Sequence, residues 1–499
     1  MADYDAIVIG AGMGGLTTGA LLAARGRKVL VLEQGSRVGG CCSTFERDGY
    51  HFDVGASIVE VLYPIELAFK QLGTTLQNEL DLIPVDPIMS FIYRDGHRVT
   101  YPLSVEKTGE VISRISPDDG VSWQAFARDF SEVTREILET FFTNPASSFG
   151  DLAAMVRRNP RIVKFLPLFL RSYQSVLQEY FKHPDVLRTM AYQSLYFGLP
   201  PEIVPGIFAL VPYSEHEGIY YPRGGMIQIP LAMQRCGERF GMQVRLNRRV
   251  GKVMVRNSRV EGVQLSDGTQ ITANLVVSDI NAKTLYLDLI GEDHLPWLAR
   301  TGIKSYKYSK AVPMVYVGLD YRPPLDAHHS ILAVSMEEVN DYWWKNAQRG
   351  VLPQEPFGLI CWSTCSDPSL APAGHHALNL IPEGFYRLSG KNWDDEKEAF
   401  IDRTVNYLDK FAIPGLASHI QVLDCATPLD FERRLCLPEG AIYALQQDLP
   451  AQAMFRPSAK SKSIQGLYLA GSSTHPGGGV PSVIGSGVIA AKLIEQNQG

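Results

Sequence analysis

The chain has 499 residues, of which 45% are hydrophobic and 20% charged, and its formal net charge at pH 7 is −6. This size allows about two or three domains, and the composition is typical of a soluble or peripheral globular protein. The weak acidic balance, with no basic tail, indicates no nucleic-acid partner. Seven cysteines in so long a chain do not form a disulfide framework, and none has histidines at zinc-ligand spacing, so no metal site is expected.

The chain opens with a strand, a glycine-rich turn and a helix. Residues 4–9 are an apolar, β-branched run that predicts a strand, and a helix is expected over 16–25 with Gly26 as its cap. The intervening glycines match G-x-G-x-x-G, a turn that brings the backbone and the helix N-terminus up to a pyrophosphate. They are Gly10, Gly12, Gly14 and Gly15.

A second predicted strand, residues 28–32, ends at Glu33. This carboxylate comes 18 residues after Gly15, where it can accept a hydrogen bond from a ribose hydroxyl. Since strand, turn, helix, strand and acid arrive in order, the sequence predicts a dinucleotide-binding βαβ unit.

A second glycine pair decides between NAD and FAD. Gln34 leads into Arg37, Gly39 and Gly40, and an extended, turn-rich segment follows over 45–55. An NAD dehydrogenase would continue with another helix and strand. The glycine pair instead resembles the FAD-binding amine oxidase and desaturase superfamily, in which the preceding arginine also approaches the cofactor. FAD is therefore the expected cofactor.

The middle of the chain alternates between helical and strand-like patterns. Helices are expected over 118–138, 171–181 and 227–240, and strands near Val244 and over 250–255, 311–319 and 359–362. Residues 259–265 and 270–272 predict a hairpin across Ser266–Thr269, and 275–279 predict a separate buried strand.

The tail predicts a strand over 466–470, a loop with Gly471 and Gly477–Gly479, and a small-residue helix from about 481 to 493. Such a loop lets backbone approach a flat or anionic group closely. The predicted fold class is α/β, with a discontinuous Rossmann-like FAD-binding domain in parts 1–75, 220–285 and 455–499. An inserted α+β substrate domain would occupy 286–454, and a helical, membrane-contacting region 76–219.

The tail, with Thr474–Gly477 and Pro481–Ser486, resembles the bacterial-type carotenoid desaturase and isomerase family. Tyr220–Met226 resembles its Y-P-x-G-G turn, and Ser366–His375 resembles the segment before its late substrate-domain strands. Amine oxidases usually carry an acid after the glycine at position 471, and the uncharged residue here matches the carotenoid branch. The resemblance covers essentially the whole chain.

This resemblance implies that Val250 contacts the adenine through its backbone and that Ser482 and Val483 lie beside the isoalloxazine. Gly471 and Ser472 would complete the FAD site. The implied activity is desaturation of phytoene or ζ-carotene towards lycopene, with hydride transfer to flavin N5 and electrons passing to a quinone or oxygen. The alternatives are a cis–trans isomerase that converts prolycopene without net oxidation, and a non-enzymatic prenyl-group carrier with the same fold.

The sequence does not identify a catalytic acid or base for this chemistry. His51 and His475 belong to loops expected near the cofactor, although a histidine bonded within a glycine-rich loop explains each as well. Arg433 and Glu439 fit a solvated helix face. The catalytic residues therefore stay open.

Because a carotenoid substrate is dissolved in the lipid bilayer, we expect a segment that contacts the membrane. Residues 151–171 are the candidate, since they combine five basic residues and one acid with Phe and Leu. This pattern predicts either a peripheral contact with anionic lipid or buried helices with basic outer faces, and Pro160 and Pro167 exclude one straight helix. We expect a protein at the cytoplasmic side of a membrane, with neither signal peptide nor transmembrane helix. Trp343 and Trp344, after Tyr342, predict either a tunnel lining or core.

Overall fold

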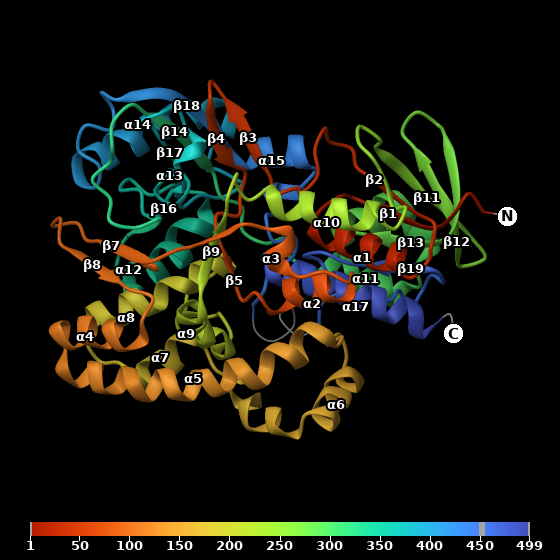
Figure 1. Cartoon of the computed structure of the whole chain (residues 1–499), viewed down its shortest axis with the longest axis horizontal. Coiled ribbons are helices and arrows are strands. Elements are labelled where there is room, and N and C mark those ends of the chain that lie inside the picture. Colours follow the sequence, from red (N-terminus) through yellow and green to blue (C-terminus); the bar gives the residue numbers. More distant parts are fainter. Residues whose placement is uncertain (1, 449–454, 498–499) are drawn as a thin grey trace.

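The computed structural model describes residues 2–448 and 455–497, in which two seven-stranded sheets stand above a helical region (Figure 1). The first sheet has the order β10-β2-β1-β13-β12-β11, with β19 against β13. Its strands come from the start, the middle and the end of the chain. They are β1 (Tyr4–Ile9), β2 (Val29–Leu32), β10 (Gln243–Arg245), β11 (Val250–Arg256), β12 (Arg259–Leu265), β13 (Gln270–Ser278) and β19 (Leu467–Leu469).

Two helices from opposite ends of the chain pack together against this sheet. They are α1 (Met13–Ala24) and α17 (Val480–Gln496), and α10 (Gln228–Glu238) packs on α1 as well. A Cβ added to Gly487 of α17 would lie 2.7 Å from the carbonyl oxygen of Gly14 in α1. Because only glycine allows this approach, the small residues of the tail helix bring the two chain ends into contact.

The predicted strands and helices of this sheet are present, with one correction. The separate strands expected over 270–272 and 275–279 are one strand, β13, because Ala273 and Asn274 continue the extended backbone between them. Its first residues pair antiparallel with β12, and the rest pair parallel with β1. The hairpin and the parallel sheet therefore share a strand.

The second sheet has the order β18-β14-β17-β16-β15-β7-β8 and is antiparallel except for the β7–β15 pair. Helix α14 (Trp393–Phe411) covers it, and Trp362, Trp393 and Phe400 are fully buried between them. Strand β14 begins at Met314 and not at residue 311 as predicted, because Pro313 has no amide to donate. The strands are β7 (Met89–Ile92), β8 (Arg98–Tyr101), β14 (Met314–Leu319), β15 (His329–Leu332), β16 (Gly358–Trp362), β17 (His376–Pro382) and β18 (Ile420–Ala426).

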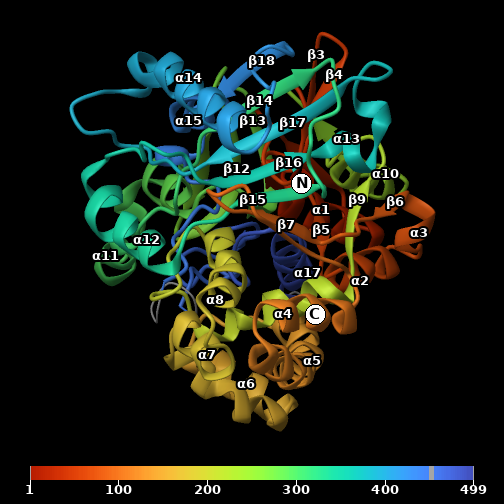
Figure 2. The same ribbon diagram turned by 90° about the vertical axis from the view of Figure 1, so that its left-hand side faces the viewer.

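The helical region lies below both sheets (Figures 1 and 2). Its longest helix is α5 (Pro117–Thr143), which exceeds the predicted 118–138 because Ser116 caps it and buried aromatic residues recur at helical spacing. The other elements are α4 (Val105–Ile115), α6 (Phe149–Arg158), the 3-10 helix η1 (Pro160–Leu170), α7 (Tyr173–Tyr180), α8 (Pro184–Ala191), η2 (Tyr192–Phe197), η3 (Gly206–Leu210), α9 (Val211–Ser214) and η4 (Glu215–Glu217).

Short elements connect these three parts. Strands β3 (Thr44–Arg47) and β4 (Tyr50–Asp53) form one ribbon, and β9 (Ile219–Pro222) lies between β5 (Val59–Glu60) and β6 (Leu82–Pro84). Within the described ranges no helix is long and apolar enough to cross a bilayer. Further helices are α2 (Tyr63–Gln71), α11 (Trp297–Ser305) and α15 (Pro428–Leu435).

Candidate functional site

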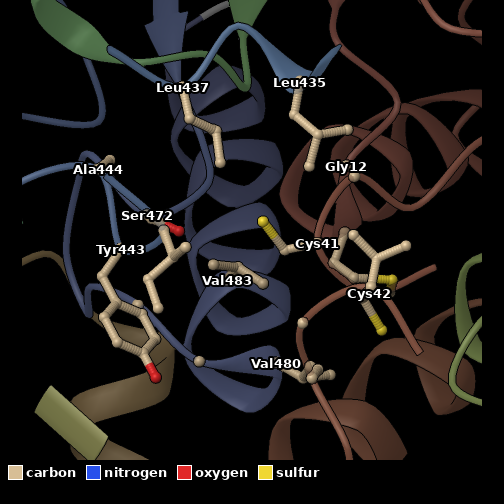
Figure 3. Close-up of a pocket in the computed structure, with 18 of the residues that line it drawn as sticks. Gly12, Cys41, Cys42, Leu435, Leu437, Tyr443, Ala444, Ser472, Val480 and Val483 are labelled. Carbon is tan, nitrogen blue, oxygen red and sulfur yellow. The ribbon is translucent and has the colours of Figure 1, made fainter. Parts of the chain in front are cut away.

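A cavity of about 930 Å³ opens where β1, β2 and β13 end, between the first forty residues and the tail. Figure 3 shows Gly12, Cys41 and Cys42 on one side of it and Ser472, Val480 and Val483 on the other. The carboxyl edge of a parallel sheet is where α/β proteins bind their ligands. The two chain ends thus form the walls of one site.

The glycine-rich loop has no room for side chains. A Cβ on Gly12 would lie 2.4 Å from Asp279 Oδ2, and one on Gly14 would lie 2.4 Å from the amide nitrogen of Gly471. Gly12 caps α1 without any side-chain hydrogen bond, so the N-terminal amides of this helix meet the cavity with their positive dipole end. This is a cradle for an anion such as a diphosphate.

Glu33 lies at the end of β2 and lines the cavity. Its carboxylate accepts hydrogen bonds from the amides of Gly35 (2.7 Å) and Ala11 (2.9 Å), which fix the side chain beside the loop. A carboxylate has about four lone-pair sites, so two accepted bonds leave room for a hydroxyl donor. The predicted bond to a ribose hydroxyl is compatible with this geometry.

The tail loop forms the facing wall. The amide of Gly471 donates to Ser486 Oγ at 2.7 Å, and the buried guanidinium of Arg456 donates to the carbonyl of Ser472. These bonds hold Ser472 at the cavity together with Ser482 and Val483 at the start of α17. The sequence around Arg456 does not indicate this role, because the role depends on how the loops around Arg456 fold.

Most of the predicted FAD-binding residues come together at this cavity. Those that line it are Gly10, Gly12, Glu33, Gln34, Arg37, Gly39, Gly40, Val250, Ser472, Ser482 and Val483. Gly14, Gly15 and Gly471 lie directly beneath the lining, where they pack against one another and against Gly10 and Asp279. Direct contact of these three with a cofactor stays a prediction.

Asp279 is a site residue that the sequence reasoning treated only as a strand end. It follows β13 directly and lines the cavity, and the backbone amides of Gly12 and Gly15 interact with its carboxylate. Burial raises the pKa of this carboxyl to about 7. An acid at the end of a parallel strand next to Gly10 was the signal that could have identified it.

The histidine candidates lie elsewhere. His475 is 2% exposed, its Nε2 lies 2.8 Å from the carbonyl oxygen of Phe141, and burial lowers its pKa to about 4. Neither His475 nor His51 lines the cavity. Arg433 forms an exposed ion pair with Asp394, as expected for a solvated helix face.

The cavity continues from the two chain ends into the helical region. There its walls are apolar side chains of α5, η2, η3 and α9, together with side chains of the second sheet. The polar exceptions include the buried pair of Lys310 and Glu383. The helical part contributes Ile137, Leu138, Phe141, Leu195, Ile207, Phe208, Leu210 and Val211.

The tryptophan pair takes no part in this lining. Tyr342 is buried against Phe357 and Phe385, and Trp343 packs at the edge of the main core. Trp344 is 49% exposed and donates to Glu202. Tyr342 and Trp343 therefore belong to the core, whereas Trp344 is neither core nor tunnel lining.

Comparison with known proteins identifies the family, since residues 13–494 match the flavin containing amine oxidoreductase family. The chain belongs to this family. It is 30% identical to a neurosporene-forming phytoene desaturase from Rhodobacter capsulatus, over 98% of this chain and 93% of the relative. It is 29% identical to a lycopene-forming phytoene desaturase from Pantoea ananas, over 98% of both chains.

Among solved structures, cyclohexylamine oxidase from Brevibacterium oxydans shares the fold, with a TM-score of 0.60, 16% identity, and coverage of 99% of this chain and 98% of the other. The mixed α/β fold is therefore that of the amine oxidoreductases. The resemblance to the bacterial-type carotenoid desaturases, drawn from the tail motifs, is confirmed.

The site fits the FAD of an amine oxidoreductase. The glycine loop offers a cradle that any Cβ would fill, the uncapped N-terminus of α1 suits a diphosphate, and Glu33 suits a ribose. FAD is the cofactor, and bound FAD supplies a hydride acceptor. The protein is thus an FAD-dependent oxidoreductase and not the carrier that shares its fold.

Proposed function

We propose that this amine oxidoreductase is a carotenoid desaturase that introduces conjugated double bonds into phytoene or ζ-carotene, towards lycopene. The observation that carries the proposal is the continuity of one cavity from the FAD loops into apolar walls. A long hydrocarbon has no hydrogen-bonding group, so it needs such walls to exclude water and hold it in register. The full-length likeness to phytoene desaturases supports this substrate class.

In this proposal the residues of the chain have two roles, which are to bind FAD and to align the substrate. Gly10, Gly12, Glu33 and the tail loop bind FAD, with Val250 at the adenine end and Ser482 and Val483 at the flavin end. The apolar side chains of α5, η2 and η3 align the polyene. The substrate domain would then comprise residues 286–454 together with the helical region 76–219, inserted between the FAD-binding parts.

The alternative is a carotenoid cis–trans isomerase with the same cofactor. Purified protein, first checked for its flavin spectrum, should be given phytoene, ζ-carotene and poly-cis-lycopene in liposomes, with a quinone or oxygen present. Products with longer conjugation and fewer hydrogens, formed only with an electron acceptor, are expected. All-trans products of unchanged mass, formed only with reduced flavin, would instead establish the isomerase.

We further propose that the protein takes its substrate at a membrane surface through residues 149–171. The segment folds as α6 and η1, and Phe149 and Leu170 are 77% and 79% exposed. Arg157 is exposed beside them, whereas Arg161 and Lys164 form ion pairs with Glu136 and Glu132 of α5. The apolar tips would enter the lipid, and Arg157, which has no ion pair among the described residues, would favour anionic headgroups.

A variant with both Phe149→Glu and Leu170→Glu should bind anionic liposomes about tenfold or more weakly, because burial of each side chain contributes about 1.5–3 kcal/mol. Co-sedimentation with liposomes measures the effect. The matched control is Leu298→Glu on α11, since Leu298 is 75% exposed outside this segment. Equal loss of binding in the control and the double variant would contradict the proposed contact.

A further inference from the structure

The apolar end of the cavity holds a carboxylate that neither cofactor binding nor substrate alignment explains. Glu60 is the last residue of β5 and lines the cavity. Glu215, in the 3-10 turn η4 just before β9, is 2% exposed and interacts with it. Strand pairing of β5 with β9 brings the two segments together, with Glu60 opposite Ile219.

No positive charge neutralises this pair. Across residues 2–448 and 455–497, neither carboxylate forms a salt bridge. The side-chain amide of Gln193 lies 3.3 Å from Glu215 Oε2, and hydrogen bonds from Gln193 and Tyr196 oppose the rise in the pKa of Glu215. Glu60 Oε2 is buried without a hydrogen-bond partner in that described part. Glu60 and Tyr196 line the cavity, whereas Glu215 is not among the residues that line it.

Such an arrangement costs free energy, because each buried polar atom without a partner loses about 1–3 kcal/mol. The backbone beside it is strained too: Val61, a β-branched residue, has a φ of 51°, in the left-handed region. Strain of this kind persists where the surrounding structure holds a functional group in place. At a purely structural position, an apolar residue would cost less free energy than these carboxylates.

The protonation of the pair follows from its surroundings. Burial raises the pKa of Glu60 to about 7. Burial, and then the charge of Glu60, raise the pKa of Glu215 well above its ordinary value. Two acids in one apolar pocket cannot both ionise easily, so near neutral pH Glu215 keeps its proton and Glu60 can exchange one.

Three tyrosines beside the pair and one histidine along the cavity do not change charge between pH 5 and 8. Burial raises the pKa of Tyr196 and of Tyr173 well above the usual range. Burial, followed by the charges of Cys41 and Glu60, raises that of Tyr443 to about 12. His329, farther along the cavity, stays neutral because burial lowers its pKa.

We propose that Glu60 is the base that takes the substrate proton in the desaturation, with Glu215 as the positioning residue that keeps the neighbouring proton. The inference rests on the proposed desaturase function. One substrate carbon gives up hydrogen with its bonding electrons to oxidised FAD. The C–H bond of the adjacent carbon then breaks, its electron pair becomes the new π bond, and the proton goes to the Glu60 carboxylate.

Glu60→Gln keeps the shape of the side chain and removes the base. The turnover number on phytoene or ζ-carotene should fall by about 10²–10⁴, the usual contribution of a general base, with FAD content and bound carotenoid unchanged. The matched control is Glu217→Gln, an exposed acid of the same 3-10 turn, which should keep wild-type turnover. Glu60→Asp retains a carboxylate and should recover part of the loss.

Two readouts separate a base from a structural role. The wild-type rate should rise as pH passes about 7, and this limb should vanish in Glu60→Gln. In substrate-free protein with FAD bound, the infrared C=O band of a protonated carboxyl should diminish over the same pH range. Asp279, whose pKa burial raises to about 7, contributes to the same change, so Glu60→Gln should lose only the share of one carboxyl. Glu215→Gln should lack one band that persists at higher pH.

The outcomes distinguish the two proposals. If wild-type protein with FAD converts neither phytoene nor ζ-carotene, the proposed function fails, whatever the infrared spectra show. If wild-type protein is active and Glu60→Gln keeps its rate and pH limb, Glu60 is not the base. If Glu60→Gln does not fold, the same judgement rests on Glu60→Leu, which removes the carboxylate and leaves no polar atom buried in its place: unchanged turnover and an unchanged pH limb would overturn the inference.

Discussion

Replacing Gly14 by alanine should weaken FAD binding and lower the flavin content of the purified protein. The added Cβ would lie 2.4 Å from the amide nitrogen of Gly471 and 2.8 Å from Asp279 Oδ1. The Gly471 amide is backbone, so the glycine loop and the tail loop must move apart, and the buried Asp279 carboxylate must turn aside. Overpacking of this kind costs about 1–3 kcal/mol, which corresponds to roughly 5- to 150-fold in affinity if it is lost from the FAD-bound state.

Flavin absorbance per mole of purified protein measures this loss, and titration with added FAD separates weak binding from misfolding. The matched control is Gly302→Ala in α11, where nothing lies within 4 Å of the added Cβ. There alanine should stabilise the helix by about 0.5–1 kcal/mol and leave FAD binding unchanged. A Gly14→Ala protein with full flavin content would show that the two loops are not held together as described.

The sequence predicts the cofactor half of the molecule well because its signals are local. A glycine loop needs small residues at fixed spacing, and the strand before it needs β-branched apolar residues, so Gly10 and Gly12 are visible without a structure. The meeting of the two chain ends could be predicted as well, since the tail has the same kind of glycine-rich loop. Packing of Gly487 on the Gly14 carbonyl explains why that helix is built of small residues.

The rest of the site could not be predicted, because it depends on contacts between distant segments. Glu60 is one acid in an otherwise apolar strand, and nothing local indicates that β9 places Glu215 near it. Asp279 gains its role only when β13 lies beside β1. His475, by contrast, stands out in the sequence of the tail. Its ring is hydrogen-bonded to the Phe141 carbonyl, so its role in the structure is to hold the tail loop against α5.

Asp53→Ala should cost the fold about 3–5 kcal/mol, the usual penalty for breaking a buried charged network. Asp53 ends β4, is 1% exposed, and accepts hydrogen bonds from Thr44 Oγ1 (2.6 Å), Tyr221 OH (2.6 Å) and the amide of Met226 (2.9 Å). Alanine leaves all three donors buried without an acceptor. These bonds join β3, β9 and the turn before α10 beside the cavity, so FAD retention should weaken too.

The pH dependence gives a second signature of this carboxyl. Burial raises the pKa of Asp53 to about 6, above its ordinary value of 3.8, although its three donors oppose the shift. The folded state therefore binds the proton more tightly than the unfolded state, and this group's contribution to stability falls as pH rises from about 4 to 6. Asp53→Asn should lose that part of the pH dependence while keeping an acceptor for Met226.

Urea unfolding of the FAD-bound proteins at several pH values measures both effects. Glu46→Ala is the matched control, because Glu46 is an exposed acid on the adjoining strand β3, and its free energy of unfolding should change by no more than about 0.5 kcal/mol. If Asp53→Ala were as mild as this control, the three hydrogen bonds could not be what joins the ribbon to β9. The wall of the cavity next to Val54 would then be held by apolar packing alone.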